Sequence, residues 1–440
     1  MIPAVLLAHH DTNGRPNCMR RLCGLTLVER ILKMLLYQEV RQILVITREG
    51  LGEEVKDHLH AHPWDLEIDF LELDAETLSF DFDALRKAKE VLWETLLVAR
   101  ADYVYDARAL TRMVSSRAST LLVGSRPVLP RAQLETTPQD ATYYYGLSLL
   151  NRVTLGNEEV SWPSSDGASP SDSLEQMERD GLVELLRLDA LPTYMVNLRR
   201  SLPIACFALQ SDEDVRVGEH ILIDATQKGT LDFPAQYLHP APENWITRRL
   251  LNTSVTPNLV TLVSNLVAFV GLWFFWEGRM AEGVASALAV GILDGVDGKL
   301  ARLKLQYSRF GDKLDHVLDL IYEPLWYLAI GGFLSRQTDY SDLTFVRVSI
   351  AIVALYFLDR IATGAFKLIR KIELFDYSGI DRLVRKLGAR RNTNVLLLLV
   401  GVILGGMDQA LWAILLLTVI TTLFHCVRAI QLSLCSKDNH

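Results

Sequence analysis

Long uncharged apolar runs in the second half of the chain limit what this sequence can fold into. Leu250–Trp276 and Gln409–Val427 contain no Asp, Glu, Lys or Arg. About 20 apolar residues are enough for a helix to cross the hydrocarbon core of a bilayer. Asn392–Met407 is shorter, but it is long enough to span together with its flanks. We therefore predict a protein embedded in the lipid bilayer, and a soluble hydrolase is excluded as a class.

Three further apolar stretches, Ala281–Leu303, Asp312–Leu334 and Leu343–Ile369, are interrupted by charged residues. A carboxylate inside a membrane costs about 2.5–3.5 kcal/mol on insertion scales, so it persists where it faces a polar interior. Counting these stretches, the sequence predicts an all-α transmembrane domain of about six helices.

Charge divides the chain at the same place as hydropathy. Residues 1–250 carry 26 Lys and Arg against 37 Asp and Glu, whereas residues 251–440 carry 19 against 16. The small basic excess of the second half lies in short segments between apolar runs, which argues against nucleic acid as a partner. The five cysteines are scattered without a CxxC pair, as is typical of reduced thiols.

Basic residues gather in the loops on one side of the predicted helices. These loops and their flanks contain Arg248, Arg249, Lys299, Arg302, Lys304, Arg309, Lys313, Lys367, Arg370, Lys371, Arg382, Arg385, Lys386, Arg390 and Arg391. The opposite loops hold Arg279, Arg336 and Arg347. The positive-inside rule then predicts a multi-pass protein of the cell membrane whose two ends and N-terminal half are cytoplasmic. The apolar run Met1–Ala8 is too short for a signal peptide.

The N-terminal half alternates apolar strands with amphipathic helices. The expected strands are Ile2–Ala8, Arg41–Thr47, Leu66–Leu73 and Thr95–Ala99, and the expected helices are Leu25–Tyr37, Gly52–His60 and Asp81–Trp93. This rhythm predicts a Rossmann-like α/β domain with a mostly parallel sheet. We expect that domain at residues 1–210, a juxtamembrane helix and linker at 211–249, and the transmembrane domain at 250–435.

Four aspartates lie inside two of the charged apolar stretches. Asp294 and Asp297 are three residues apart, and Asp315 and Asp319 are four apart, so each pair shares one face of its helix. If the two helices are antiparallel neighbours, the four carboxylates meet near the cytoplasmic surface. A single aspartate of this kind is usually a loop charge or a structural ion pair. Four at this spacing, in segments that are otherwise buried in the membrane, instead indicate a functional site.

Four converging carboxylates need positive charge. Oxygen ligands and paired carboxylates suit Mg²⁺ or Mn²⁺, and two such ions provide what phosphoryl transfer from a pyrophosphate requires. One carboxylate beside the ions can take the proton of an attacking hydroxyl. Gly298 and Gly311 remove side chains where a ligand must come close.

The pattern DxxDGxxAR-x8-GxxxDxxxD, from Asp294 to Asp319, resembles that of the CDP-alcohol phosphotransferases. Thr256-Pro257-Asn258-x-x-Thr261 opens the matching region, which extends from about Leu250 to Cys435. The resemblance implies that a phosphoalcohol passes from a CDP-alcohol donor to an acceptor hydroxyl, with release of CMP. It also implies three groups of residues. The metal ligands are Asp294, Asp297, Asp315 and Asp319, with Asp319 as the catalytic base, and the CDP-binding residues are Asn258, Thr261, Gly298, Ala301, Arg302 and Gly311.

Arginines near the fourth and fifth predicted helices suggest where the acceptor binds. Arg390 and Arg391 precede the fifth helix, and Arg360 lies in the fourth. Guanidinium groups bind phosphate bidentately, so these residues favour a phosphorylated acceptor. Lipid headgroups are the alternative partners of Arg390 and Arg391. An ion pair with the adjacent Asp359 is the alternative for Arg360.

The N-terminal half resembles a nucleotidyltransferase domain. The resemblance is carried by its opening strand, by Gly24–Leu32, by Ile43–Thr47 and by Asp102. Fused ahead of a phosphotransferase, and with Lys228-Gly-x-x-Asp232 before the first membrane helix, it is similar to the bifunctional inositol-phosphate cytidylyltransferase and di-inositol-phosphate phosphate synthases. However, Ala8–Arg21 contains one glycine and no lysine, where that family has a glycine-rich phosphate loop. We expect a solvated loop there and a degenerate domain.

Three interpretations follow. In the first, the protein is a membrane phosphotransferase of phospholipid or polyol-phosphate synthesis with an inactive nucleotidyltransferase-like domain. In the second, it is bifunctional and also makes its CDP-alcohol from CTP and inositol phosphate. In the third, the membrane part is a non-catalytic anchor, which the complete aspartate pattern disfavours. The donor remains open among CDP-diacylglycerol, a CDP-archaeol and CDP-inositol, and the resemblance also implies a homodimer.

Overall fold

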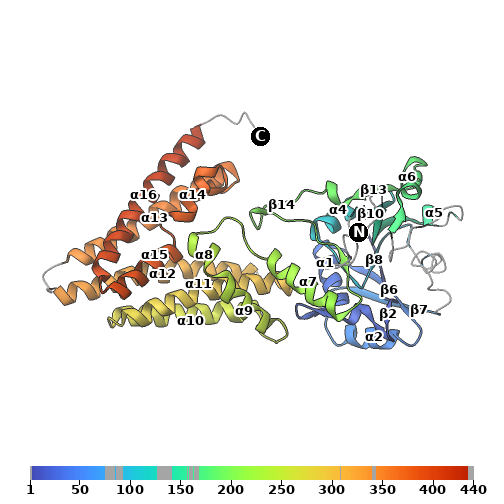
Figure 1. Ribbon diagram of the computed structural model, residues 1–440, viewed down its shortest axis with the longest axis horizontal. Coiled ribbons are helices and arrows are strands. Elements are labelled where there is room, and N and C mark those ends of the chain that lie inside the picture. The colour runs from blue at the N-terminus through green and yellow to red at the C-terminus, as the bar shows by residue number, and fades with distance from the viewer. Residues whose placement is uncertain are drawn as a thin grey trace. The chain divides into compact units, whose positions relative to one another are not determined.

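The computed structural model describes residues 2–74, 85, 93–125, 141–155, 157, 162, 168–307, 309–338 and 343–434. Within these ranges, the side chains of 141, 168–173, 309–316, 338 and 434 lie outside the description. The chain forms two compact units (Figure 1). The first comprises Met1–Met195 with Ser201–Ala225, and the second comprises Val196–Arg200 with Thr226–His440.

The first unit is built on an eight-stranded sheet. Its strands are β1 (Ala4–Leu7), β6 (Gln42–Arg48), β7 (Glu67–Leu73), β8 (Thr95–Arg100), β10 (Thr120–Gly124), β11 (Ala141–Asn151), β12 (Ala168–Pro170) and β13 (Glu184–Arg187). They lie in the order β13-β10-β11-β8-β1-β6-β7, and β12 pairs with β11. β1 is parallel to β6 and β8, whereas β11 runs antiparallel to β8, β10 and β12. The predicted α/β domain with a mostly parallel sheet is confirmed.

β1 shows how the sheet carries a hydrophobic core on each face. Because successive side chains of a strand point to opposite faces, Ala4 and Leu6 join one buried cluster while Val5 and Leu7 join the other. The first face is covered by α1 (Leu27–Tyr37), α2 (Gly52–His60) and α4 (Ala107–Val114), and the second by α6 (Ser171–Arg179). The unit ends in α7 (Asp212–Ala225). The predicted helix Asp81–Trp93 lies mostly outside the described residues.

Smaller elements complete this unit. They are β2 (Asp11–Thr12), β3 (Arg15–Pro16), η1 (Asn17–Met19), β4 (Arg21–Leu22), β5 (Leu25–Thr26), β9 (Tyr103–Val104), α5 (Arg152–Leu155), η3 (Leu188–Ala190), β14 (Tyr194–Met195), β15 (Arg200–Ser201) and β16 (Phe207–Ala208). Thr26 and Glu29 form a reciprocal capping box that fixes the start of α1.

The segment between β1 and α1 is folded. Asn13 and Gly14, with φ of 55° and 75°, join β2 to β3. Positive φ at both central residues is the geometry of a type I′ hairpin turn, which Asn-Gly favours. His9 is buried, and Asp11 pairs with Arg48 at 2.8 Å. The expectation of a solvated loop over Ala8–Arg21 is therefore wrong, because the hairpin packs this segment against the unit.

The second unit is helical. Its helices are α8 (Phe233–Tyr237), α9 (Pro240–Leu251), α10 (Pro257–Trp276), α11 (Met280–Leu303), α12 (Arg309–Thr338), α13 (Thr344–Arg370), η4 (Leu374–Asp376), α14 (Gly379–Leu387), α15 (Arg391–Leu404) and α16 (Met407–Leu434). α10 lies beside α11, and α13 beside α16 (Figure 1). Ala268, Val290, Trp326, Ile352 and Leu411 belong to the core that joins these helices.

Local sequence sets the ends of these helices. Thr256 caps α10 by accepting a hydrogen bond from the Leu259 amide, and Pro257 occupies the first turn, where a missing N–H costs nothing. Gly405 ends α15 with φ of 69°, the left-handed conformation that glycine adopts without strain.

Four segments of the second unit are long and apolar enough to cross a membrane. They are Pro257–Trp276, Val317–Gln337, Gly379–Leu404 and Met407–Ser433. α11 and α13 are of similar length, but they carry more charge. A helical region with several apolar spans is therefore confirmed, whereas crossing by α11 and α13 remains a prediction.

Candidate active site

The predicted aspartates lie on two helices. Asp294 and Asp297 belong to α11, one turn apart, and Asp319 belongs to α12. Gly311 and Asp315 lie in the first turns of α12, and their side chains fall outside the described residues. The structure therefore brings together Asp294 and Asp319 as the sequence predicts, while the position of the Asp315 carboxylate stays a prediction.

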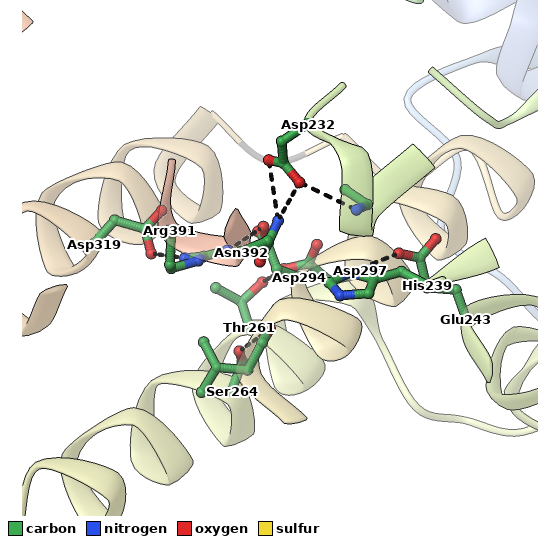
Figure 2. Close-up of polar contacts among 12 residues, drawn as sticks. Asp232, His239, Glu243, Thr261, Ser264, Asp294, Asp297, Asp319, Arg391 and Asn392 are labelled. Atoms are coloured by element: carbon green, nitrogen blue, oxygen red, sulfur yellow. Dashed lines mark hydrogen bonds and ion pairs between the residues drawn. The ribbon is translucent and has the colours of Figure 1, made fainter. Parts of the chain in front are cut away.

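Arg391 connects the two helices. It is the first residue of α15, and its guanidinium donates to Asp294 Oδ2 at 2.6 Å and to Asp319 Oδ1 at 2.7 Å (Figure 2). The same group lies 2.6 Å from the Tyr322 hydroxyl, which itself donates to Asp319. Charge-assisted bonds of this kind are among the stronger ones in proteins. One arginine thus neutralises carboxylates from both acidic helices.

Asp297 points toward α10. The Thr261 hydroxyl lies 2.6 Å from Asp297 Oδ2 and 3.2 Å from the Pro257 carbonyl. Thr261 is buried, whereas Asn258 is exposed in the first turn of α10. Of the two residues predicted on α10, Thr261 therefore contacts the acidic site directly.

Gly298, Ala301 and Arg302 follow the aspartates on α11. A Cβ at Gly298 would lie 3.2 Å from Arg302 Nη2, so the glycine leaves room for the guanidinium to fold back against the helix. Gly298 and Arg302 both line the cavity described next. Ala301 is partly buried on the same helix.

The acidic residues line a cavity of about 470 Å³ within the second unit. Asp294 and Asp319 lie on one part of its wall. Seven basic residues also line it, namely Lys228, Lys299, Arg302, Arg360, Arg385, Arg390 and Arg391. Such a cavity is large enough for a small polar substrate, and its five guanidinium groups suit an anionic one. The three predicted acceptor-site arginines all belong to this wall.

Residues 226–251 form another part of the wall. Asp232 caps α8 by accepting from the Ala235 amide, and it also accepts from the Asn392 side-chain amide at 3.2 Å (Figure 2). Burial lowers the pKa of the Lys228 ammonium below its ordinary value, with the charge of Arg302 acting in the same direction. This juxtamembrane segment is therefore part of the cavity rather than a linker.

α9 packs on α11 through a buried ion pair. Lys299 Nζ lies 2.9 Å from Glu243 Oε2 and 2.6 Å from Asn244 Oδ1. Burial raises the pKa of the Glu243 carboxyl, against the opposing effect of Lys299. Burial lowers the pKa of His239, which lies 3.8 Å from Glu243 (Figure 2).

The alternative explanation for Arg360 is an ion pair with Asp359. In the structure, however, the two side chains have other neighbours. Asp359 Oδ1 lies 2.5 Å from His425 Nδ1, so Asp359 forms a hydrogen bond with the histidine of α16. The Arg360 guanidinium lies over the Tyr356 ring, 5.1 Å from its centroid, and faces the cavity.

Several wall residues escaped the sequence prediction. Glu323 is buried and follows Asp319 by four residues, so the spacing that selected Asp315 and Asp319 could have included it. Lys228 belongs to the Lys228-Gly-x-x-Asp232 segment that the sequence singled out, but nothing there linked it to the acidic helices. Arg385 carries no such signal, because tertiary packing alone brings α14 to the cavity.

The donor set fits hard divalent cations. Asp294, Asp297 and Asp319 offer oxygen ligands, and a positive group, the Arg391 guanidinium, already lies between two of them. Among the described residues, no three His, Cys, Asp or Glu side chains lie close enough to share one ion. Metal binding by the three described aspartates together with Asp315 therefore stays a prediction.

In the first unit, Asp102 lies just after β8, at the carboxyl end of that strand. Its two oxygens accept from Arg100 Nε at 2.9 Å and Nη2 at 2.7 Å, and both side chains are fully buried. Arg100 also lies 4.9 Å from the centroid of the Tyr103 ring. Gly146, with φ of 62°, leaves space for it, because a Cβ there would lie 2.8 Å from Arg100 Cδ.

Comparison with known proteins agrees with the geometry of the second unit. Residues 254–424 match the family described as CDP-alcohol phosphatidyltransferase. The bifunctional IPC transferase and DIPP synthase of Rubrobacter xylanophilus is 26% identical over 332 residues, which is 70% of this chain and 70% of that protein. Its namesake in Aquifex aeolicus is 21% identical over 94% of this chain and 92% of its own length.

A solved structure is also similar, the inositol-1-phosphate CTP transferase of T. maritima. It has a TM-score of 0.36 at 16% identity, and the match covers 50% of this chain and 96% of that one.

The helices that line the acidic cavity, α11, α12 and α15, lie within the matched region, and the matched family is one of phosphotransferases, enzymes that move substituted phosphate groups. The family match over the same helices identifies residues 254–424 as a CDP-alcohol phosphatidyltransferase domain. Enzymes of this family depend on divalent metal.

Proposed function

We propose that the protein is an integral membrane phosphotransferase of phospholipid or polyol-phosphate synthesis. It transfers a phosphoalcohol, of the phosphatidyl or phosphoinositol type, from a CDP-alcohol to an acceptor hydroxyl. The observation that carries this proposal is the meeting of Asp294 and Asp319 on the wall of a cavity rich in guanidinium groups. Six segments, namely α10–α13, Gly379–Leu404 and α16, cross the cell membrane, and the cavity opens to the cytoplasm.

The reaction balances as a substitution at phosphorus. The acceptor oxygen forms a bond to the phosphorus that carries the alcohol, and the bond from that phosphorus to the oxygen of CMP breaks. CMP leaves with the electron pair of this bond, and the acceptor proton passes to a carboxylate. We assign that carboxylate to Asp319, whose Oδ1 lies on the cavity wall.

Asp294, Asp297, Asp315 and Asp319 would hold two divalent ions, Mg²⁺ or Mn²⁺. When bound, such ions neutralise the pyrophosphate and stabilise the leaving phosphate of CMP. The Thr261 hydroxyl holds Asp297 in place. Gly298, Ala301, Arg302 and Gly311, with Asn258 and Thr261, would lie along the CDP moiety, Arg302 supplying positive charge.

We assign the acceptor to the part of the cavity lined by Arg360, Arg390 and Arg391. Three guanidinium groups on one wall favour an acceptor that is itself phosphorylated. The homodimer expected by resemblance remains a prediction, which light scattering in detergent would test.

For the predicted domain at residues 1–210, most of which lies in the first unit, we propose a cytoplasmic location and no cytidylyltransferase activity. A carboxylate whose oxygens are both engaged by a buried guanidinium has little capacity left for a metal-bound nucleotide. The second candidate is a bifunctional enzyme that makes its own CDP-alcohol from CTP and inositol phosphate. It is favoured by the match to a relative of that description over 94% of this chain.

A product assay on the purified protein with Mg²⁺ tests both proposals. One reaction contains CDP-diacylglycerol or CDP-inositol with a panel of free and phosphorylated polyols, and CMP is measured. A parallel reaction contains CTP and inositol phosphate, and pyrophosphate is measured. CMP without pyrophosphate supports a phosphotransferase with an inactive first unit. Pyrophosphate would establish the bifunctional enzyme, and the absence of CMP with every donor would refute the phosphotransferase proposal.

A further inference from the structure

Arg391 occupies the oxygens that the proposed metal site needs. Its Nη2 bonds Asp294 Oδ2 and its Nη1 bonds Asp319 Oδ1, so one guanidinium joins the two acidic helices. The side chain is only 11% exposed. The Asp294 and Asp319 side chains are 38% and 26% exposed, so the buried guanidinium is the member of the group that most needs these partners, and it serves as their counter-ion in this structure.

A divalent cation and this guanidinium cannot share the same two oxygens favourably, because both are positive and would lie within a few ångströms of each other. A cation that takes Asp294 Oδ2 and Asp319 Oδ1 therefore displaces the Arg391 side chain. The displaced group remains in the cavity, whose wall also carries Arg360 and Arg390.

The backbone of Arg391 is held while its side chain exchanges partners. Arg391 begins α15, and the next residue, Asn392, donates both to Asp232 Oδ1 and to Oδ2 at 3.2 Å (Figure 2). Asn392 also lies against α11, since a Cβ at Gly291 would lie 2.7 Å from Asn392 Oδ1. The start of α15 is thus fixed between α8 and α11, and the long arginine side chain is the part that can move.

We propose that Arg391 is an exchangeable counter-ion that couples the two ligands of the cavity. Without metal it neutralises Asp294 and Asp319. With metal it is released toward Arg360 and Arg390, where its guanidinium binds the phosphate of the acceptor. This inference rests on the proposed metal site and phosphorylated acceptor, and it adds an order to their binding.

Coupling of this kind is reciprocal. If metal raises the affinity for the acceptor phosphate by some factor, the phosphate raises the affinity for metal by the same factor. We expect a factor of about 10, within the usual range for linked sites. The consequence for the cycle is that a phosphorylated acceptor binds weakly until the ions are in place.

Calorimetric titration of the full-length protein in detergent tests the proposal, with Mn²⁺ as the metal probe and glycerol phosphate as the phosphate probe. In the unaltered protein, saturating Mn²⁺ should tighten glycerol phosphate binding about tenfold. In Arg391→Gln, Mn²⁺ should bind about tenfold more tightly than in the unaltered protein, because its internal competitor is gone, and the coupling should fall below about twofold.

Arg360→Gln is the matched control. It also removes a guanidinium from the cavity wall, but in the proposal this guanidinium does not bind the aspartates. It should weaken glycerol phosphate binding, leave Mn²⁺ affinity unchanged and retain the coupling. If Arg391→Gln does not fold, Arg391→Lys replaces it. A lysine reaches one carboxylate rather than two, so Mn²⁺ should bind about threefold more tightly than in the unaltered protein.

The outcomes distinguish the counter-ion proposal from the proposed metal site on which it rests. Unchanged or weaker Mn²⁺ binding in the Arg391 variants, or coupling that survives in Arg391→Gln, overturns the counter-ion proposal while the metal site stands. Failure of the unaltered protein to bind Mn²⁺ overturns both. Loss of Mn²⁺ binding in Asp294→Asn confirms that the titration reports this site.

Discussion

The carboxylate of Glu243 on α9 lies 2.9 Å from the ammonium of Lys299 on α11, and both side chains are buried. The pair lies beside Gly295, which follows Asp294 on α11. A Cβ at Gly295 would lie 2.2 Å from Glu243 Cδ, a distance that atoms cannot adopt without movement. The close approach of the juxtamembrane helix to the acidic helix therefore depends on a glycine that the aspartate pattern leaves unspecified.

Gly295→Ala should destabilise the second unit by about 1–3 kcal/mol, the usual cost of overpacking. Gly364→Ala on α13 is the matched control, because nothing lies within 4 Å of its Cβ position. There the substitution should be neutral or stabilising, since alanine favours helix over glycine by about 1 kcal/mol. Thermal melts in one detergent compare the two, and equal melting temperatures would contradict the tight packing of α9.

Asp319→Asn should lower the rate of CMP release at least about 100-fold, because it removes both the proposed base and a proposed metal ligand. Asp408→Asn, on α16, removes a carboxylate of the same helical unit outside the cavity and should keep the rate within about twofold. Rates are measured with Mg²⁺ and again in excess EDTA, which should stop the reaction. A normal rate in Asp319→Asn would rule out the assigned base.

Arg100→Met should cost the first unit about 3–5 kcal/mol, because it leaves the Asp102 carboxylate buried without its partner. Arg48→Met provides the comparison. Its pair with Asp11 is partly exposed, with side chains 41% and 20% accessible, so its loss should cost less than about 1 kcal/mol. Denaturant unfolding followed by circular dichroism measures both. If the two variants proved equally stable, the buried Arg100–Asp102 pair would contribute no more to the stability of the first unit than the partly exposed Arg48–Asp11 pair.

Buried thiols give the first unit a dependence on alkaline pH. Burial raises the pKa of Cys23 and of Cys206 to about 12. In the unfolded chain the thiol pKa is about 8.5, so above that pH the unfolded state releases protons that the folded state keeps. The free energy of unfolding should therefore fall as pH rises from about 8.5 toward 12.

Stability measured at pH 8 and pH 10 checks this dependence, with the double substitution Cys23→Ala and Cys206→Ala as the comparison. The double variant should lose less stability between the two pH values than the unaltered protein. Iodoacetamide at pH 9 should label both cysteines in urea and spare them in the native protein. Rapid native labelling would show that these thiols are accessible.

Sequence alone was enough for features that depend on local periodicity. The strand Arg41–Thr47 and the helix Gly52–His60 lie within a residue of the observed β6 and α2, because alternation and helical spacing are properties of short segments. The spacing of Asp294 and Asp319 in otherwise apolar helices likewise led to the acidic cavity. Both predictions use physics that acts within one or two elements.

Features that depend on distant packing were missed. The salt bridge of Arg391 with Asp294 joins residues 97 positions apart, and nothing in either segment specifies it. Antiparallel β11 interrupts the sheet because β10, β11 and β8 are paired by tertiary structure. The hairpin at Asn13-Gly14 is different, since this dipeptide is a local signal for a type I′ turn that the sequence already carried.

The bridge formed by Arg391 also has a consequence for biosynthesis. Asp294 leaves the ribosome 97 residues before Arg391. At a synthesis rate of about 5–20 residues per second, Arg391 is made about 5–20 s after Asp294. During that interval the carboxylate must be stabilised by water or by ions from solution, which holds its end of α11 at the aqueous surface. Completion of the acidic cavity is therefore a late event of membrane insertion, and it begins when α15 is made.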